Sequence, residues 1–261
     1  MKKLLRFKKR IIASVLTFAC AICLAHIARP MAVNVFNSIS QGERKLPIYC
    51  VDTDENKVAI SFDAAWGADD TDTLLDILKQ NNVKATFFMC GYWVDKYPEE
   101  VKKIASAGHD LGNHSATHPH MNSLSSEQIK KEIQDTHQKV LNLTGYEMEL
   151  FRPPFGEYNN TVIQAASECG YHTIQWDVDS LDWKERGVES EINQVLNHKH
   201  LGKGSIILFH NDAKYTPDAL GTIIQGLKNK GFEIVPVSEL IYKENYEMDN
   251  EGRQKLVTPQ I

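Results

Sequence analysis

Ionisable side chains recur at the ends of apolar segments in this chain. Asp63 closes one such segment, His114 and His118 follow another, and Arg152 and His210 close two more. If these segments are parallel strands, their carboxyl ends meet around one site, which is where such folds bind their substrates. A single histidine at the edge of a core, such as His210, is usually structural. The same pattern at several strand ends predicts a shared polar site.

The imidazoles of His114 and His118 are four residues apart. On a helical turn this spacing places both rings on one face, as binding of a divalent metal requires. The alternative is a pair of surface histidines in a histidine-rich region, because His109 and His120 lie close by. A metal site at this pair therefore depends on its companions.

Arg152 opens the segment Arg-Pro-Pro-Phe-Gly. The two prolines stiffen the backbone, and a rigid backbone can hold an arginine and backbone N–H groups toward a developing negative charge. The alternative is a structural turn between a strand and a helix, in which the arginine pairs with a surface carboxylate. The local sequence favours neither.

Trp176 and Trp183 flank the carboxylates of Asp177, Asp179 and Asp182. Aromatic rings beside polar groups suit the binding of a sugar ring, although tryptophans are also common core residues. The segment is therefore a candidate wall of a carbohydrate site.

Strand and helix patterns alternate between residues 57 and 242. Apolar β-prone runs predict strands, and amphipathic patterns between them predict helices. The expected strands are 58–62, 85–89, 110–113, 150–152, 172–177, 205–209 and 233–237. The expected helices are 71–80, 98–107, one that carries Ile129, Ile133 and Val140, and then 161–169, 189–197 and 218–229. Ser125 and Gln128 offer a capping box, and Gly145 can end the same helix.

This alternation requires a parallel sheet, either closed as a barrel or open and doubly wound. About seven strands in this length would form a slightly small barrel. A glycine-rich phosphate loop does not follow the first strand, which argues against dinucleotide binding. The net charge of -5 and the pI near 6.1 argue against a nucleic-acid partner. Nothing in the sequence points to a protein partner.

In this order, the polar segments resemble those of the polysaccharide deacetylase family, also called the NodB-homology domain or carbohydrate esterase family four. The resemblance runs from about Lys57 to Tyr242. It implies a distorted seven-stranded parallel (β/α) barrel and a divalent metal, commonly zinc. The implied reaction is hydrolytic removal of N-acetyl groups from amino sugars of cell-wall polysaccharide, with peptidoglycan or chitin-like oligomers as substrates.

The resemblance also implies roles for single residues. Ser61-Phe62-Asp63 resembles the first motif, so Asp63 would be the general base. His114 and His118 match the paired metal-binding histidines. Arg152 would orient the base, and the backbone N–H of Phe155 would help to bind the oxyanion.

The remaining motifs supply the acid and the sugar contacts. Leu208-Phe209-His210 matches the fifth motif, with His210 as general acid. Asp179 to Trp183 resembles the fourth motif, and Asp179 would tune the acidic histidine. Trp66 and Trp183 are expected to contact the substrate.

Position 64 departs from the family pattern. The first motif usually carries two adjacent aspartates, and the second is the third metal ligand, but Ala64 stands there in this chain. Catalytic zinc normally has three protein ligands. The site is therefore expected to be weakened, or to draw Asp63 into ligation, with Asp69 and Asp70 as possible substitutes. This Asp-x-x-Trp-Gly form resembles a subgroup of spore-forming bacteria, which indicates a setting in sporulation or cell-wall processing.

The chain ends predict further segments. Residues 1–10 carry six lysines and arginines, and an apolar run follows from Ile11 to Ile27. This pattern is typical of a signal peptide or membrane anchor and indicates a location outside the cytoplasmic membrane. The predicted division is 1–28 signal or anchor, 29–56 linker, 57–242 deacetylase-like domain and 243–261 polar tail.

The five cysteines follow no metal-binding spacing. Cys20 and Cys23 fall in the apolar run, and Cys50, Cys90 and Cys169 are scattered. No disulfide framework follows from these positions. They are interpreted as small core or surface residues.

Three functions are compatible with these residues. The first is a metal-assisted deacetylase of cell-wall amino sugars. The second is a glycan-binding barrel that has weak or lost catalysis because of Ala64. The third is a hydrolase for another acyl or phosphate ester, because a fold does not fix its substrate. The retained Asp63, Arg152, Asp179 and His210 favour the enzyme.

Overall fold

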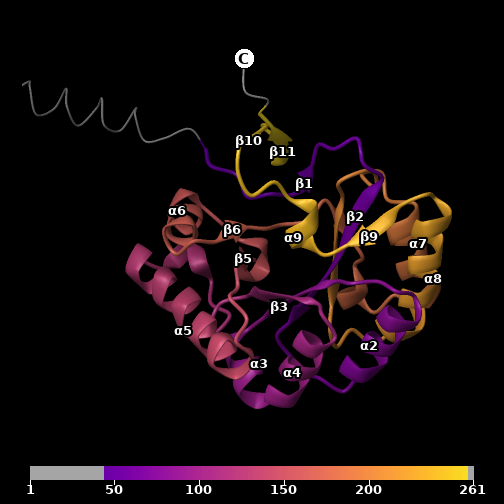
Figure 1. The fold of residues 1–261 in the computed structure, drawn as a ribbon, viewed down its shortest axis with the longest axis horizontal. Coiled ribbons are helices and arrows are strands. Elements are labelled where there is room, and N and C mark those ends of the chain that lie inside the picture. Colours follow the sequence, from indigo (N-terminus) through magenta and orange to yellow (C-terminus); the bar gives the residue numbers. More distant parts are fainter. Residues whose placement is uncertain (1–43, 258–261) are drawn as a thin grey trace, which may run out of the picture. The chain divides into compact units, whose positions relative to one another are not determined.

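Parallel strands form the central sheet of this protein, whose computed structural model describes residues 44–257 (Figure 1). The strands run in the order β6-β5-β4-β3-β2-β8-β7, and β9 pairs with the first residues of β2. Their bounds are β2 (Lys57–Ala64), β3 (Thr86–Met89), β4 (Asp110–Asn113), β5 (Leu150–Phe151), β6 (His172–Thr173), β7 (Val178–Asp179), β8 (Ile206–His210) and β9 (Glu233–Val235). Each pairing in this sheet is parallel. The curled sheet confirms the predicted α/β barrel class.

Helices lie around the outside of the strands (Figure 1). They are α2 (Thr71–Gln80), α3 (Gly91–Lys96), α4 (Pro98–Ser106), α5 (Ser126–Thr144), α6 (Asn160–Glu168), α7 (Val188–Leu196), α8 (Thr216–Asn229) and α9 (Val237–Leu240). The capping box of Ser125 and Gln128 begins α5, and Gly145 ends it with φ 75°, as predicted. The short helices α3 and α9 were not predicted, because they are too brief to show a periodic pattern.

Apolar side chains fill both faces of the sheet. Phe62 stacks on Phe87 with ring centroids 4.9 Å apart, and Phe209 lies 5.6 Å from the Phe62 ring, in the layer between strands and helices. A second cluster lies on the other face and includes Ala59, Phe88, Leu150, Ile174 and Ile206. Because side chains alternate along a strand, burial on both faces explains why the strands read as continuous apolar runs.

The chain begins to join this domain earlier than predicted. The predicted linker extended to Asn56, but Ile48 and Val51 are buried in the core. Val51 belongs to the strand β1 (Cys50–Val51), and its backbone N–H donates to the Gly204 carbonyl at 2.9 Å. Gly204 has φ +79°, and a Cβ there would lie 1.8 Å from the Val51 oxygen, so this close approach requires glycine.

The predicted polar tail from Lys243 also differs from the structure. Residues 246–256 form β10 (Tyr246–Met248) and β11 (Arg253–Leu256), and β11 pairs in parallel with β1. The side chain of Gln254 is fully buried and hydrogen-bonds both the backbone N–H and the carbonyl of Tyr242. The polar composition of residues 246–256 gave no sign of these two strands, because they are stabilised by backbone pairing and not by an apolar face.

None of the helices in residues 44–257 combines the length and the apolar character needed to cross a membrane. The apolar run from Ile11 to Ile27, on which the predicted export or anchoring rests, lies outside the described residues.

Candidate active site

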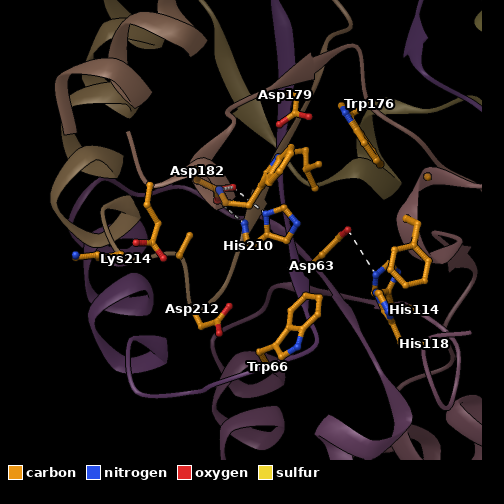
Figure 2. Close-up of a pocket in the computed structure, with 16 residues that line it drawn as sticks. Asp63, Trp66, His114, His118, Trp176, Asp179, Asp182, His210, Asp212 and Lys214 are labelled. Carbon is orange, nitrogen blue, oxygen red and sulfur yellow. Dashed lines mark hydrogen bonds and ion pairs between the residues drawn. The ribbon is translucent and has the colours of Figure 1, made fainter. Parts of the chain in front are cut away.

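A pocket of about 510 Å³ opens at the carboxyl ends of the central strands (Figure 2). Ten residues that the sequence singled out line it: Asp63, Trp66, His114, His118, Phe155, Trp176, Asp179, Asp182, Trp183 and His210. Side chains from at least four separate segments therefore share one cavity. Arg152 lies directly behind the lining, where it contacts Asp63.

Arg152 holds Asp63 from below the pocket. Its Nη1 donates to Asp63 Oδ1 at 2.7 Å, and its Nη2 donates to the Ser61 hydroxyl at 2.9 Å and to the Gln175 carbonyl at 3.2 Å. Arg152 has no exposed surface and Asp63 is only 5% exposed, which excludes the alternative of a surface ion pair. Burial alone would raise the pKa of Asp63, but the charges of Arg152, His114 and His210 lower it below its ordinary value. Asp63 is therefore an oriented, ionised carboxylate.

His114 is fixed by the backbone of the same arginine. Its Nδ1 lies 2.7 Å from the Arg152 carbonyl oxygen, which can only accept a hydrogen bond. The proton is therefore on Nδ1, and the lone pair of Nε2 points toward Asp63, whose Oδ2 lies 3.6 Å away. Figure 2 shows this imidazole on one side of Asp63 and His210 on the other.

His118 reaches the same place from a loop, and not from the helical turn that the spacing suggested. The segment after β4 is irregular, with φ of 70° at Ser115 and 57° at His118. The two imidazole centroids lie 5.0 Å apart. Burial and the charge of His114 lower the pKa of His118 to about 4, so its ring is neutral, as metal ligation requires.

Glu132 of α5 holds this loop. Its carboxylate accepts hydrogen bonds from the backbone N–H groups of Ala116 at 2.9 Å and Thr117 at 2.8 Å, and from the Thr117 hydroxyl at 2.9 Å. The hydroxyl of Ser115 accepts from the His118 N–H at 3.1 Å. Sequence reasoning missed Glu132, since nothing in a solvated helix face distinguishes one glutamate from its neighbours.

His210 is hydrogen-bonded by Asp182, whereas Asp179, which the sequence resemblance implied would tune this histidine, makes no hydrogen bond to it. His210 Nδ1 lies 2.8 Å from Asp182 Oδ1, and the His210 backbone N–H donates to Asp182 Oδ2 at 2.6 Å. Asp179 instead accepts a hydrogen bond from the Leu181 N–H at 2.8 Å, which turns its Oδ1 toward its own loop. Asp179 still lines the pocket.

The pKa of His210 is raised above its ordinary value. Burial alone would lower it, but the hydrogen bond and the charge of Asp182 raise it, with smaller contributions from Asp63 and Asp179. The hydroxyl of Thr216 donates to Glu191 at 2.9 Å and lies 3.3 Å from Asp182 Oδ2. A buried polar network therefore fixes the carboxylate behind His210.

Three large aromatic side chains stand at the rim. Trp66, Phe155 and Trp183 are each 55% exposed, although apolar groups of this size are normally buried. Phe155 has φ 59° and packs edge-on against His118 at 4.5 Å. Trp66 makes a similar contact with His118 at 5.3 Å. Exposed rings around a polar floor are suited to the apolar face of a sugar.

Two further lining residues were not predicted. Asp212 accepts a hydrogen bond from the Gly67 N–H at 3.0 Å and so fixes the loop that carries Trp66. Lys214 lies at the rim. Both follow His210 at alternate positions, which is the signal that could have identified them.

The donors in this pocket fit a divalent metal. Two neutral imidazoles and a buried carboxylate lie within one cavity, and imidazole with carboxylate is a common catalytic metal set. Ala64 is fully buried in the core between strands and helices. The suggested substitutes Asp69 and Asp70 are not among the residues that line the pocket.

Known proteins share this sequence and geometry. The profile of the polysaccharide deacetylase family matches residues 51–174. A peptidoglycan-N-acetylglucosamine deacetylase of Bacillus cereus is 38% identical over 196 residues, which cover 73% of this chain and 91% of that protein. The chain belongs to the polysaccharide deacetylase family, which is a family of carbohydrate hydrolases, and the resemblance found in the sequence is confirmed.

Two solved structures have the same fold. One is a CE4 family pseudoenzyme from Bacillus anthracis, 33% identical with a TM-score of 0.72, and the match covers 81% of this chain and 70% of that one. The other is a peptidoglycan N-acetylglucosamine deacetylase, 34% identical with a TM-score of 0.71, and the match covers 76% of this chain and 95% of that one. The same architecture therefore serves an active deacetylase and a pseudoenzyme.

Proposed function

We propose that this protein removes N-acetyl groups from the amino sugars of peptidoglycan by metal-assisted hydrolysis. The observation that carries the proposal is the placement of Asp63 between His114 and His210 on the floor of one pocket (Figure 2). A base, two metal-type imidazoles and an acid then face the same space. The deacetylase activity of the Bacillus cereus relative, with its peptidoglycan substrate, supports the choice of substrate.

Asp63 would take the proton of the attacking water. Its Oδ1 is held by Arg152, and its Oδ2 points toward His114. The guanidinium keeps the carboxylate ionised in a buried place, where it would otherwise tend to be neutral. A general base needs both this charge state and a fixed direction toward the proton that it removes.

His210 would give a proton to the departing amine. The hydrogen bond from its Nδ1 to Asp182 leaves Nε2 as the ring nitrogen available to the pocket. Because Asp182 stabilises the imidazolium, a proton is present on this ring over a wider range of pH than on an ordinary histidine. This is the charge state that a general acid requires.

His114 and His118 would hold the divalent metal, for which we infer zinc. When bound, the metal would supply Lewis acidity toward the acyl oxygen and the attacking water. The chain contributes neutral rings in fixed orientations, set by the Arg152 carbonyl for one and by the Glu132-bound loop for the other. The backbone N–H of Phe155 is the proposed protein donor to the oxyanion.

Acetate release tests the proposal. Purified protein loaded with Zn²⁺ is incubated with N-acetylglucosamine oligomers and with peptidoglycan, and free acetate is measured. We expect release from at least one substrate and loss of that release in His114→Ala. The matched control is His172→Ala, a histidine outside the pocket, which should leave turnover unchanged. Equal turnover of His114→Ala and wild type after thorough metal removal would contradict metal assistance.

Glycan binding without efficient turnover is the second candidate. It is favoured by Ala64 at the usual ligand position and by the structural likeness to a pseudoenzyme. Calorimetric titration with the same oligomers separates the candidates. Affinity for the oligomers without acetate from either substrate would select the binding protein.

We also infer that the protein acts outside the cytoplasmic membrane. The basic residues 1–10 and the apolar run that follows them support export or anchoring, and peptidoglycan is an extracytoplasmic polymer. A setting in sporulation follows only from the resemblance of the Asp63 motif to a subgroup of spore-forming bacteria. Fractionation of the host cell, with antibody detection in membrane and medium, tests the location.

A further inference from the structure

With Asp63 assigned as the base, the two histidines leave the proposed metal one protein ligand short of the usual three. Catalytic zinc normally has three protein ligands, and Ala64 removes the one that usually joins the two histidines. A third ligand is needed only if the protein binds a metal, so any residue assigned to this role rests on the proposed metal-assisted function.

Cys90 lies beside the histidine pair. In the described part of the chain, Cys90, His114 and His118 form a group in which one ligand atom from each residue lies within 4.8 Å of the others. The sulfur also lies 3.3 Å from the backbone carbonyl oxygen of His114. Three donors of zinc type therefore gather at the carboxyl ends of β3 and β4.

Strand register explains this proximity. Phe88 of β3 pairs with Asp63 of β2 on one side and with Gly112 of β4 on the other. Cys90 and His114 each come two residues later, just past the ends of β3 and β4, so the register brings the two residues side by side. The side chain of Cys90 lies in the core cluster that also contains Ala64, behind the residues that line the pocket. The Cys90 N–H donates to the Ala64 carbonyl at 3.0 Å, which ties this residue to the position that lacks its aspartate.

Charge chemistry is compatible with this role. Cys90 is fully buried, and a thiol in a metal-free, buried place is ordinarily a neutral S–H. A divalent cation reverses this preference, because a coordinating thiol is deprotonated outright. Since both imidazoles already bind through neutral nitrogens, metal uptake would release one proton per ion, from the sulfur to solvent.

We propose that Cys90 is the third protein ligand of the divalent metal, in place of the carboxylate missing at position 64. Asp63 is then left to act as the base, since Arg152 already holds its Oδ1. A thiolate donor also favours zinc and cobalt over magnesium or calcium.

Cobalt spectroscopy tests the ligand directly. A thiolate bound to Co²⁺ gives an intense charge-transfer band in the near ultraviolet, whereas imidazole and carboxylate do not. The full-length protein carries Cys20→Ser and Cys23→Ser, because that pair could itself bind the probe. We expect the band in this background, with about one proton released per ion.

The comparison then uses two buried cysteines. Cys90→Ser should lose the band and bind Co²⁺ more weakly by about 100-fold or more. This loss exceeds the 10–100-fold decrease in affinity that is typical when a residue that only supports a metal ligand is removed. Cys50→Ser, the matched control, should keep both properties, because Cys50 is also buried but is not part of the group that Cys90 forms with His114 and His118. If Cys90→Ser does not fold, a variant that retains Cys90 as its one cysteine decides the matter, since a band there can come from no other sulfur.

Two results would overturn the proposal. The first is the absence of a thiolate band from the variant that retains only Cys90. The second is loss of the metal in Asp63→Asn while Cys90→Ser binds it normally, which would make Asp63 the ligand. Acetate release separates this proposal from the function on which it rests. A thiolate band without acetate release would support Cys90 as a ligand and contradict the deacetylase activity. Normal acetate release and normal metal content in Cys90→Ser would support the activity and contradict Cys90 as a ligand.

Discussion

Asp182 binds His210 at two points, through the ring Nδ1 at 2.8 Å and through the backbone N–H at 2.6 Å. One carboxylate therefore sets both the position of the imidazole and its charge. Asp179, the last residue of β7, hydrogen-bonds its own loop instead. The two aspartates are consequently separable by substitution.

We expect Asp182→Asn to move the alkaline limb of the pH–rate profile to lower pH. The charge that raises the pKa of His210 is removed, so the ring loses its proton earlier as the pH rises. At alkaline pH, turnover should fall by roughly 10²-fold, the lower end of what a general acid contributes. The profile is obtained from initial rates of acetate release between about pH 5 and pH 10, a range that includes the titration of imidazole. Asp179→Asn is the control, and an equal shift in that variant would contradict the assignment.

The same pair links stability to pH. The raised pKa of His210 means that its contribution to folding is fully present below the ordinary pKa of imidazole. It is lost as the pH rises through the raised value. The difference in Tm between wild type and Asp182→Asn should therefore shrink toward alkaline pH.

Glu132→Ala should weaken the metal site without touching a ligand. Three hydrogen bonds that hold the loop between His114 and His118 depend on this carboxylate. Loss of an outer partner of metal ligands typically costs 10–100-fold in affinity, and we expect a decrease of about this size for Zn²⁺. Competition with a chromogenic chelator measures it. Glu127→Ala, which removes an exposed glutamate of the same helix, should leave the affinity unchanged.

Trp183→Ala should raise KM for N-acetylglucosamine oligomers with little change in Tm. The side chain is 55% exposed, so its removal leaves no buried cavity. A ring that stacks on a sugar contributes about 1–2 kcal/mol, which corresponds to roughly a 5- to 30-fold rise in KM. Steady-state acetate release gives the constant. Leu256→Ala, equally exposed on β11, is the control, and a similar rise there would argue against a role in binding sugar.

Gln254→Ala should destabilise the domain, although Gln254 lies in a segment of polar composition. The buried amide bonds both backbone groups of Tyr242, and these would be left without partners. Unsatisfied buried groups cost about 1–3 kcal/mol each, so the midpoint of urea unfolding should fall clearly. Gln225→Ala breaks an exposed hydrogen bond to Asn81 and should change the midpoint little. Equal midpoints for the two variants would support a loose tail instead.

The sequence was sufficient for the elements that alternate with a clear period. The helix of residues 71–80 was predicted with the bounds that the structure shows, since apolar side chains recur on one face between recognisable ends. The sequence also predicted that polar residues at strand ends share one site, because parallel strands bring their carboxyl ends together. Asp63, His114 and His210 do line one pocket.

The sequence could not provide relationships between distant segments. Asp182 and Asp179 are indistinguishable in a run of carboxylates, and the turn that aims one of them at His210 depends on Leu181 with φ 55°. Glu132 acts from a helix whose neighbouring acids are merely solvated. The pairing of β11 with β1 joins residues about two hundred positions apart, and no local pattern encodes such a contact.

The position of β1 also determines how this domain can be attached to something else. It lies beside Gly204 and Ser205, at the amino ends of the strands whose carboxyl ends carry Asp63 and His210. A fusion partner or solid support joined just before Leu46 would therefore approach from the side remote from the cavity. Immobilised in this orientation, the protein would keep its mouth open to a long polymer strand.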